Sequence, residues 1–256
     1  MRVARIGFTP LKGGRHVEHS AVDLGPEGPV GDRVLCLVDP ARDRVLRTVE
    51  HPTLVRAVAA LDGPRLTVRL GADRWQGVPA PTGDVRTVDY WGREAKVELL
   101  AGPWAGALSE HLGLDVALAR PARAGAVVYG GPVSLVTTSS LHRLSAEVGA
   151  PVEGARFRPT FVVDTGTAAP YVEDHWAGRE LSLGSAVVRV RGPVPRCAVV
   201  DLDPVSGARD APVLRTLAGY RRGLGAVREP AFGVDADIVR PGRVTVGDMI
   251  TVGRTE

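Results

Sequence analysis

The chain has 256 residues, of which 44% are hydrophobic and 24% are charged, and these values exclude a disordered or collagen-like protein. Its 32 Lys and Arg residues against 29 Asp and Glu give a net charge of +3, with no run of like charges, so a nucleic-acid-binding groove is not indicated. With 31 glycines, 20 prolines and 5% aromatic residues, the composition favours many turns and short β-strands.

The first half of the chain is predicted to consist of short strands separated by turns. Residues 33–38 (RVLCLV) form an apolar strand that ends at an Asp-Pro pair, and residues 44–49 follow closely enough to complete a hairpin. Residues 65–70 (RLTVRL) alternate between apolar and polar side chains as a half-buried strand does, and residues 95–100 (AKVELL) alternate less regularly.

A helix is predicted over residues 103–113 (PWAGALSEHLG), because one Trp and two Leu residues recur four positions apart and the final glycine suits a C-terminal cap. Residues 121–132 are rich in Gly, Ala and Pro and predict a loop or linker. We therefore place a boundary near residue 125 and expect two domains, 1–125 and 126–256.

The second half is predicted to mix strands with two short helices. The helices cover residues 139–147 and 212–217, and the strands are residues 134–137, 160–163, 180–192 (a strand, a turn and a strand), 197–202 and 243–252 (a hairpin around Gly247-Asp248). The predicted fold class is therefore mostly β, within an α+β chain that has a few short helices.

The apolar runs and the cysteine content of the sequence predict the cellular compartment. No apolar run approaches the ~18 residues that a membrane helix needs, and the first residues show neither a signal core nor a cleavage pattern. Two cysteines, Cys36 and Cys197, cannot form a disulfide framework. We expect a cytoplasmic protein with reduced thiols and no membrane partner.

The sequence contains no P-loop, no GxGxxG or GxSxG, no HExxH and no CxxC. His16 and His19 suggest a metal site, but their spacing matches neither face of a strand and no Cys or carboxylate cluster follows them. A polar surface loop is the favoured interpretation of this pair, and no metal is assigned to it.

Cys197 follows a proline-containing segment, PVPRC (193–197), at the predicted start of a strand. Arg196 places a permanent positive charge next to it and would favour the thiolate, which binds soft metals or attacks sulfur and carbon. A buried structural cysteine is the alternative, as it is for Cys36, which lies within an apolar strand.

Arg156 and Arg158 flank a phenylalanine just before a predicted strand. Strand-like alternation would send both guanidinium groups to one face, where at least one could clamp an anion. Two exposed arginines beside a core aromatic residue are the alternative.

Blocks of sequence in a fixed order cover almost the whole chain. In the second half they are RFRPTFVV (156–163), YVEDHWAGRELSLGSAVVRVRGPVPRC (171–197), a DP-x-SG stretch (203–207), PAFGV (230–234) and GRVTVGD (242–248); in the first half they are TPLKGG (9–14), GPVGDRVLCLVD (28–39), EHP (50–52) and YWGREAKVELLAGPWAGALSEHLG (90–113). Together they resemble the MOSC family, the molybdenum cofactor sulfurase C-terminal domain, preceded by its N-terminal β-barrel companion.

The resemblance implies an N-terminal β-barrel domain and a MOSC β-barrel domain with a cleft between them. In members similar to the mitochondrial amidoxime reducing component, that cleft holds a molybdopterin cofactor, and the cysteine that ligates its molybdenum aligns with Cys197. The family's cofactor-binding Lys aligns with Lys12, the Arg of its G-D-R motif with Arg33 and the Arg of its F-R-P motif with Arg158. Arg and Lys donors suit an anionic pterin, and a thiolate suits molybdenum.

Several positions depart from the family pattern. They are Gly13 for Ser, Val49 for Arg, Gly130-Gly131 for a Thr-Ser pair, Thr160 for Asn, and Val200-Asp201 for a Thr-Thr pair. Each hydrogen bond lost to a charged group costs roughly 1.5–3 kcal/mol, and Asp201 would repel an anion in the cleft. Gly130, Gly131 and Thr160 are still expected at the cofactor site, because glycine N–H groups also cradle phosphate.

Three functions follow from this pattern. The first is a molybdenum-cofactor oxidoreductase that reduces N-hydroxylated or N-oxide small molecules with electrons from a separate electron-transfer protein, because two cysteines cannot hold an iron–sulfur cluster. The second is a cofactor-free protein in which Cys197 acts as a nucleophile or as a persulfide carrier supplied by a cysteine desulfurase. It would serve sulfur transfer or a specialised biosynthetic reaction, with Asp201 or Asp203 as a base. The third is a module that binds an anionic metabolite beside an inert Cys197.

Overall fold

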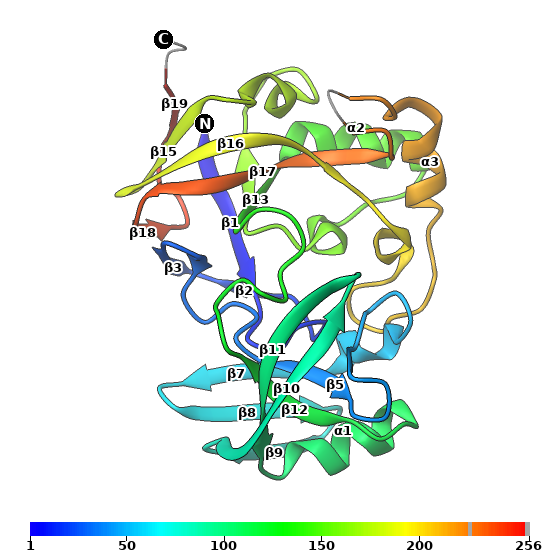
Figure 1. Cartoon of the computed structure of the whole chain (residues 1–256). Coiled ribbons are helices and arrows are strands. Elements are labelled where there is room, and N and C mark those ends of the chain that lie inside the picture. The colour runs from blue at the N-terminus through cyan, green and yellow to red at the C-terminus, as the bar shows by residue number, and fades with distance from the viewer. Residues whose placement is uncertain (225–226, 254–256) are drawn as a thin grey trace.

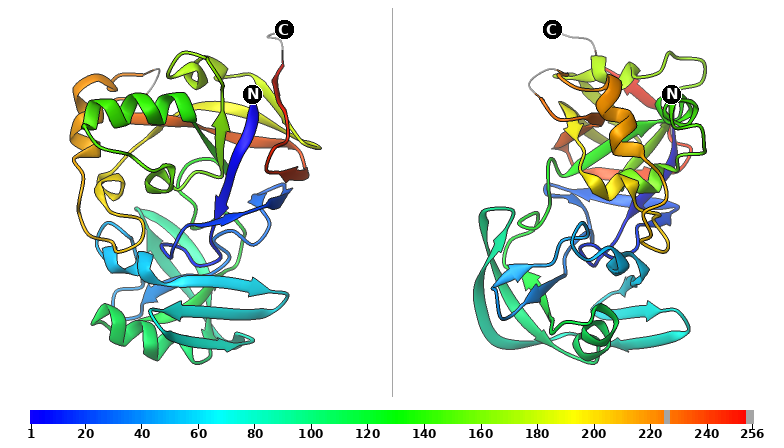
Figure 2. Two further views of the ribbon diagram at one scale, coloured as in Figure 1. Left: turned by 180° about the vertical axis from the view of Figure 1, so that it is seen from behind. Right: turned by 90° about the vertical axis from the view of Figure 1, so that its right-hand side faces the viewer.

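The computed structural model describes residues 1–224 and 227–253, and strands are its predominant regular structure. Figure 1 shows two lobes, one above the other, and both views in Figure 2 show the same separation. We call the upper one the sheet lobe and the lower one the barrel lobe. The mostly β fold class predicted from the sequence is confirmed. Among the described residues, no helix combines the length and apolar character needed to cross a membrane.

The sheet lobe is built on an eight-stranded sheet. Its strands, in spatial order, are β19 (Ile250–Val252), β15 (Glu180–Leu183), β16 (Ala186–Pro195), β17 (Ala231–Arg240), β13 (Val133–Thr137), β14 (Phe161–Asp164), β1 (Arg2–Phe8) and β2 (Val17–His19). A three-stranded sheet of β18 (Gly242–Thr245), β3 (Ala21–Gly25) and β4 (Gly28–Pro29) shares its apolar core, to which Val22, Leu24 and Val244 contribute.

Two α-helices and three 3-10 helices complete the sheet lobe. They are α2 (Thr138–Val148), α3 (Val213–Tyr220), η2 (Gly154–Phe157), η3 (Val172–Trp176) and η4 (Ala198–Asp201). The side chain of Thr137 caps α2 by accepting a hydrogen bond from the amide of Ser140, and Gly149 ends the helix in a left-handed conformation. Leu144, Leu217 and Phe232 are fully buried in a second apolar cluster of this lobe.

The barrel lobe contains a closed barrel and a small separate sheet. The barrel strands are β10 (Ala80–Tyr90), β11 (Arg93–Ala101), β12 (Ala117–Pro121), β5 (Cys36–Asp39) and β6 (Arg44–Val45), and the sheet consists of β7 (Val58–Asp62), β8 (Arg65–Leu70) and β9 (Asp73–Gly77). Helices α1 (Trp104–Leu112) and η1 (Pro52–Arg56) accompany them. Leu66, Trp104 and Leu108 share one core, so the alternation in β8 and the four-residue spacing in α1 match the burial.

Strand β1 belongs to the sheet lobe although it begins the chain. It pairs antiparallel with β14, with Ile6 opposite Phe161, while β3 pairs with β18. Residues on both sides of position 125 therefore share the sheets of one lobe. The division of the chain at residue 125 stays a prediction.

Two predicted elements are wrong. Residues 197–202 do not form a strand: β16 ends at Pro195, and the chain turns into η4, closed by a bond from the Val200 amide to the Cys197 carbonyl (3.2 Å). The predicted hairpin over residues 243–252 does not form either, because β18 pairs with β3 and β19 pairs with β15. Backbone bonds between Val3 and residues 247–248 hold the intervening turn against β1 and direct the two strands to different sheets.

Gly233 allows β17 to lie against β13. Its φ is +68°, and an added Cβ would lie 2.4 Å from the carbonyl oxygen of Leu135, a backbone atom that cannot rotate away. We expect Gly233→Ala to lower the free energy of unfolding by about 1–3 kcal/mol, measured by urea denaturation.

The matched control for Gly233 is Gly106→Ala in α1. Nothing lies within 4 Å of a Cβ at Gly106, so this change should leave stability unchanged or raise it by up to about 1 kcal/mol. Equal stability of the Gly233→Ala variant and the wild type would show that β17 and β13 are not this close.

Candidate functional site

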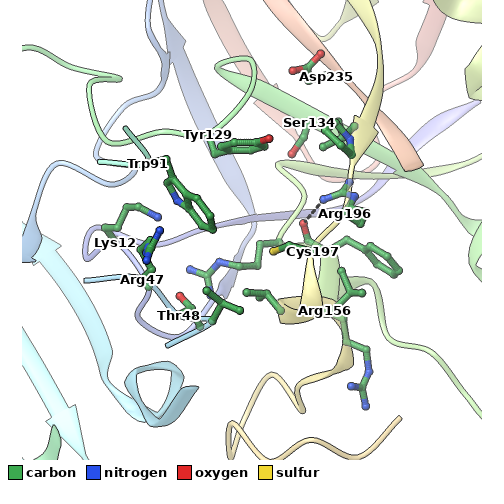
Figure 3. A pocket seen from close by; sticks show the side chains of 18 of the residues that line it. Lys12, Arg47, Thr48, Trp91, Tyr129, Ser134, Arg156, Arg196, Cys197 and Asp235 are labelled. Carbon is green, nitrogen blue, oxygen red and sulfur yellow. Dashed lines mark hydrogen bonds between the residues drawn. The ribbon is translucent and has the colours of Figure 1, made fainter. Parts of the chain in front are cut away.

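A cavity of about 300 Å³ is lined by residues of both lobes. Figure 3 shows its side chains: Lys12, Arg47 and Trp91 approach from the barrel lobe, whereas Cys197 and Asp235 approach from the sheet lobe. The cavity therefore exists only because the two lobes meet. It brings together five of the residues expected at the site from the sequence: Lys12, Arg33, Gly131, Arg158 and Cys197.

Tight backbone turns place the cationic side chains in the cavity wall. Arg33 and Arg158 both adopt left-handed conformations, with φ of 47° and 51°. The amide of Arg33 bonds to the carbonyl of Thr9 (2.8 Å), and the amide of Arg158 bonds to the carbonyl of Ala155 (3.0 Å). Such conformations cost about 1–3 kcal/mol in residues other than glycine, and they cluster at functional sites. Here they present two guanidinium groups to one space.

These cations repel one another and are withdrawn from water. Burial, together with the charges of Arg33 and Arg158, lowers the pKa of Lys12 to about 7. Burial followed by repulsion from Arg33 lowers the pKa of Arg158 to about 10. Arg33 pairs with Asp32 through Nε (2.6 Å), but across the described chain no hydrogen bond or ion pair satisfies the Lys12 ammonium or the Arg158 guanidinium. The Lys12 nitrogen lies only over the ring of Tyr90, 5.0 Å from its centroid. The wall of the cavity therefore suits an anion.

The thiol of Cys197 is exposed in this cavity. Arg196 beside it does not reach into solvent: its guanidinium donates to the carbonyls of Phe232 (2.6 and 2.8 Å) and Phe157 (3.1 Å). Burial lowers the pKa of Arg196 to about 10. These bonds fix the segment that carries Cys197, so the sulfur has a defined position, and Cys36 is the cysteine that lies buried in the barrel.

The remaining predicted site residues are placed differently. The Asp201 carboxylate accepts hydrogen bonds from Arg209 (2.7 Å) and from the amide of Leu214 (2.7 Å), so it caps the start of α3, and it is not among the residues that line the cavity. Thr160 is buried, and its hydroxyl accepts a bond from the Ser134 amide (3.2 Å). Gly131 lines the cavity, whereas its neighbour Gly130 does not.

Arg156 and Arg158 do not share a face, contrary to the prediction from alternation. Both precede the strand: Arg156 lies in η2 and Arg158 is the left-handed residue that ends it. Arg156 contacts the cavity but is committed to a bidentate pair with Asp210 (2.7 Å for both bonds) and to the carbonyl of Leu202 (2.9 Å). It holds the segment after Cys197 in place, and Arg158 alone is left free to bind.

His16 and His19 are also separated. The ring of His19 stacks on Phe8, with centroids 3.8 Å apart, and the ring of His16 lies against Gly7, where an added Cβ would meet it at 2.1 Å. Burial, with Arg158 and Arg33 nearby, lowers the pKa of His16 to about 3. The residues that the structure describes include no group of three or more His, Cys, Asp or Glu side chains able to hold a metal.

Several lining residues were missed in the sequence, among them Ser134 and Asp235. Arg47 stacks over Trp91, with its guanidinium carbon 4.4 Å from the ring centroid, and Thr48 and Tyr129 line the same cavity. Arg47 is two residues before Val49, where the family pattern places its arginine. Trp91 and Tyr129 are 41% and 55% exposed, in a chain with few aromatic residues. The available sequence signal was that Arg47 lies close to Val49, the position at which the family pattern has an arginine.

The family model described as "MOSC domain" matches residues 114–251, which is more than half of the chain. The chain belongs to the MOSC-domain family. This family is associated with the molybdenum cofactor. The MOSC match begins just after α1, before β12 of the barrel lobe, and ends within β19.

Curated relatives of this MOSC protein include mitochondrial amidoxime reducing component 2 from Macaca fascicularis and from Homo sapiens. Each is 34% identical over 125 residues, which cover 46% of this chain and 36% of the relative. The matched stretch thus spans little more than a third of the relatives' length. Similar solved structures are the YuaD protein of Bacillus subtilis (TM-score 0.46, 12% identity, covering 98% of this chain and 94% of that one) and YiiM of Geobacillus stearothermophilus (TM-score 0.35, 12% identity, 48% and 54%).

The donors of the MOSC cavity fit the cofactor associated with the family. A molybdopterin carries a phosphate and a dithiolene, so it is anionic and binds a metal that accepts sulfur ligands. Among the residues that the structure describes, Lys12 and Arg158 have no anionic partner, and Cys197 presents its thiol beside them. A group that supplies negative charge and a thiolate-binding metal would satisfy all three.

In cofactor-free protein we expect the Lys12 ammonium to lose its proton near pH 7, well below the usual value for lysine, because burial and the two guanidinium groups disfavour its charge. Carbon-13 labelling of lysine Cε gives two signals to follow by NMR, since Lys12 and Lys96 are the only lysines. The Lys12→Arg variant identifies which signal belongs to Lys12. Titration of the Lys12 signal above pH 10 would contradict the burial of this ammonium.

Proposed function

We propose that the cavity binds the molybdenum cofactor and that the chain is an oxidoreductase that reduces N-hydroxylated or N-oxide small molecules. The observation that carries this proposal is the gathering of unpartnered cations, Lys12 and Arg158, around the exposed thiol of Cys197. A stable protein keeps such charges together only where an anion compensates them. The similarity to the amidoxime reducing components supports the reaction class.

The roles of the chain's own residues follow from their chemistry. Lys12, Arg33 and Arg158 would bind the phosphate and the pterin, and Arg47 would supply the guanidinium that Val49 lacks. Cys197 would ligate the metal through its sulfur, held by the bonds of Arg196 to backbone carbonyls. When bound, the cofactor supplies two-electron redox chemistry at its metal.

The overall reaction needs electrons and protons from outside the cavity. Reduction of an N–OH group to N–H consumes two electrons and two protons and releases water. Two cysteines cannot hold an iron–sulfur cluster, so we assign the electrons to a separate electron-transfer protein. Trp91 and Tyr129, which are partly exposed beside the cavity, offer apolar surface to the organic part of a substrate.

The second candidate function uses Cys197 without a cofactor. It is favoured by the exposure of the thiol and by Gly13 and Val200, which offer no hydroxyl where the family pattern has one. A cysteine desulfurase would then pass the outer sulfur of its persulfide to the Cys197 thiolate and regain its own thiolate. Asp201 would not act as a base, because Arg209 and the Leu214 amide already hold its carboxylate.

The cofactor test measures molybdenum, tungsten and pterin in protein from a host that makes the cofactor. We expect close to one metal and one pterin per chain. Lys12→Met and Arg158→Met should each lower the pterin content at least tenfold at limiting cofactor, because a charge-assisted hydrogen bond is worth roughly 1.5–3 kcal/mol.

The cysteine test compares Cys197→Ala with Cys36→Ala. Loss of the sulfur ligand should abolish reduction of an N-hydroxylated amidine and remove one sulfur from the metal's coordination shell, as measured by X-ray absorption. Cys36→Ala, in the barrel core, should keep both properties. Folded wild-type protein with neither metal nor pterin would sink the oxidoreductase proposal, and thiocyanate released from Cys197 by cyanide would then support the persulfide carrier.

A further inference from the structure

The cavity has an acidic side as well as a cationic one. Asp235, on β17, lines it, and so does Ser134. In Figure 3, Asp235 and Ser134 lie at the upper right, Lys12 and Arg47 lie at the left, and the rings of Trp91 and Tyr129 come between them. The carboxylate is therefore separated from the cations expected to hold the cofactor, and it is not needed to neutralise them.

The glycine pair at 130–131 makes room for this carboxylate. The amide of Gly131 donates to Oδ2 of Asp235 at 2.5 Å. An added Cβ would lie 3.0 Å from the same oxygen at Gly130 and 3.1 Å from it at Gly131. Side chains such as the Thr-Ser pair of the family pattern would crowd Asp235. The two glycines and the aspartate thus form one unit of the cavity wall.

The charge of Asp235 has little compensation from the protein. Its side chain is 14% exposed, and the nearest cation, Nη1 of the half-exposed Arg191, lies 3.7 Å away. Arg196 is already bonded to two backbone carbonyls. Within the described residues, Oδ1 of Asp235 accepts no hydrogen bond. Burial raises the pKa of this carboxyl, and the charge of Arg191 only partly offsets this effect.

Exposed aromatic rings lie next to the carboxylate. Tyr129 directly precedes the glycine pair, and its ring centroid is 6.1 Å from that of Trp91, with the planes tilted by 55°. A carboxylate beside aromatic faces is an arrangement that binds organic cations, because the ring faces and the carboxylate both attract positive charge. The opposite side of the cavity is positively charged and would repel an organic cation.

We propose that Asp235 determines the substrate specificity of this cavity: the substrate is a small organic cation whose charged nitrogen group binds Asp235 while its apolar part packs on Trp91 and Tyr129. The reaction on that substrate rests on the proposed function above, but the binding preference does not. A cationic substrate at the acidic side would complement an anionic cofactor at the other.

The test is isothermal titration calorimetry at pH 7.5 with two probes of the same shape, benzamidine, which is a cation, and benzamide, which is neutral. In the wild type we expect benzamidine to bind at least tenfold more tightly. Asp235→Asn should remove this preference, and Asp235→Ser gives the same reading if the amide variant does not fold. Asp237→Asn is the matched control, since Asp237 carries the same charge on the same strand but is 61% exposed, and it should keep the preference.

Metal and pterin content are measured on the same samples. Wild-type protein that lacks both but prefers benzamidine would overturn the proposed reaction and support the specificity of Asp235. Wild-type protein that binds the two probes equally, or an Asp235→Asn variant that keeps the preference, would overturn the role of Asp235 whatever the metal content.

Discussion

The structure depends on like charges held together out of water. Lys12, Arg33 and Arg158 surround one cavity, and Asp32 is the carboxylate bonded to Arg33. Their mutual repulsion shows in the lowered pKa values of Lys12 and Arg158. Such an arrangement destabilises the protein alone and becomes favourable when an anion enters. The cavity is therefore arranged to bind an anionic ligand.

The fold supplies this arrangement through turns more than through regular elements. Arg33 and Arg158 are held in left-handed conformations between strands, and Cys197 stands at the start of η4, after the last proline of β16. Arg196 donates to backbone carbonyls, and Arg156 donates to a backbone carbonyl and to Asp210, so both fix the segments around the thiol. Rigid sheets on either side carry these turns, which is how two lobes build a site that neither contains alone.

Regular patterns made much of the fold predictable. The alternation in β8, the spacing in α1 and the resemblance of whole sequence blocks gave the strands, the helix and the cavity residues Lys12, Arg33, Arg158 and Cys197. Long-range pairing was not predictable: nothing local indicates that β18 joins β3 or that the turn after β18 binds β1. The coupling of Asp235 to a glycine pair 104 residues away, through one hydrogen bond, has no sequence signal either.

The pairing of β1 with β14 has a consequence for synthesis on the ribosome. Residues 2–8 leave the exit tunnel long before their partner strand, Phe161–Asp164, which is made more than 150 residues later. Until then β1 has unpaired backbone groups and an apolar side that includes Val3 and Ile6. The barrel strands, which pair among themselves, can close in the meantime. Nascent chains should therefore pass through a state in which the barrel is complete and the first strand awaits a chaperone or its distant partner.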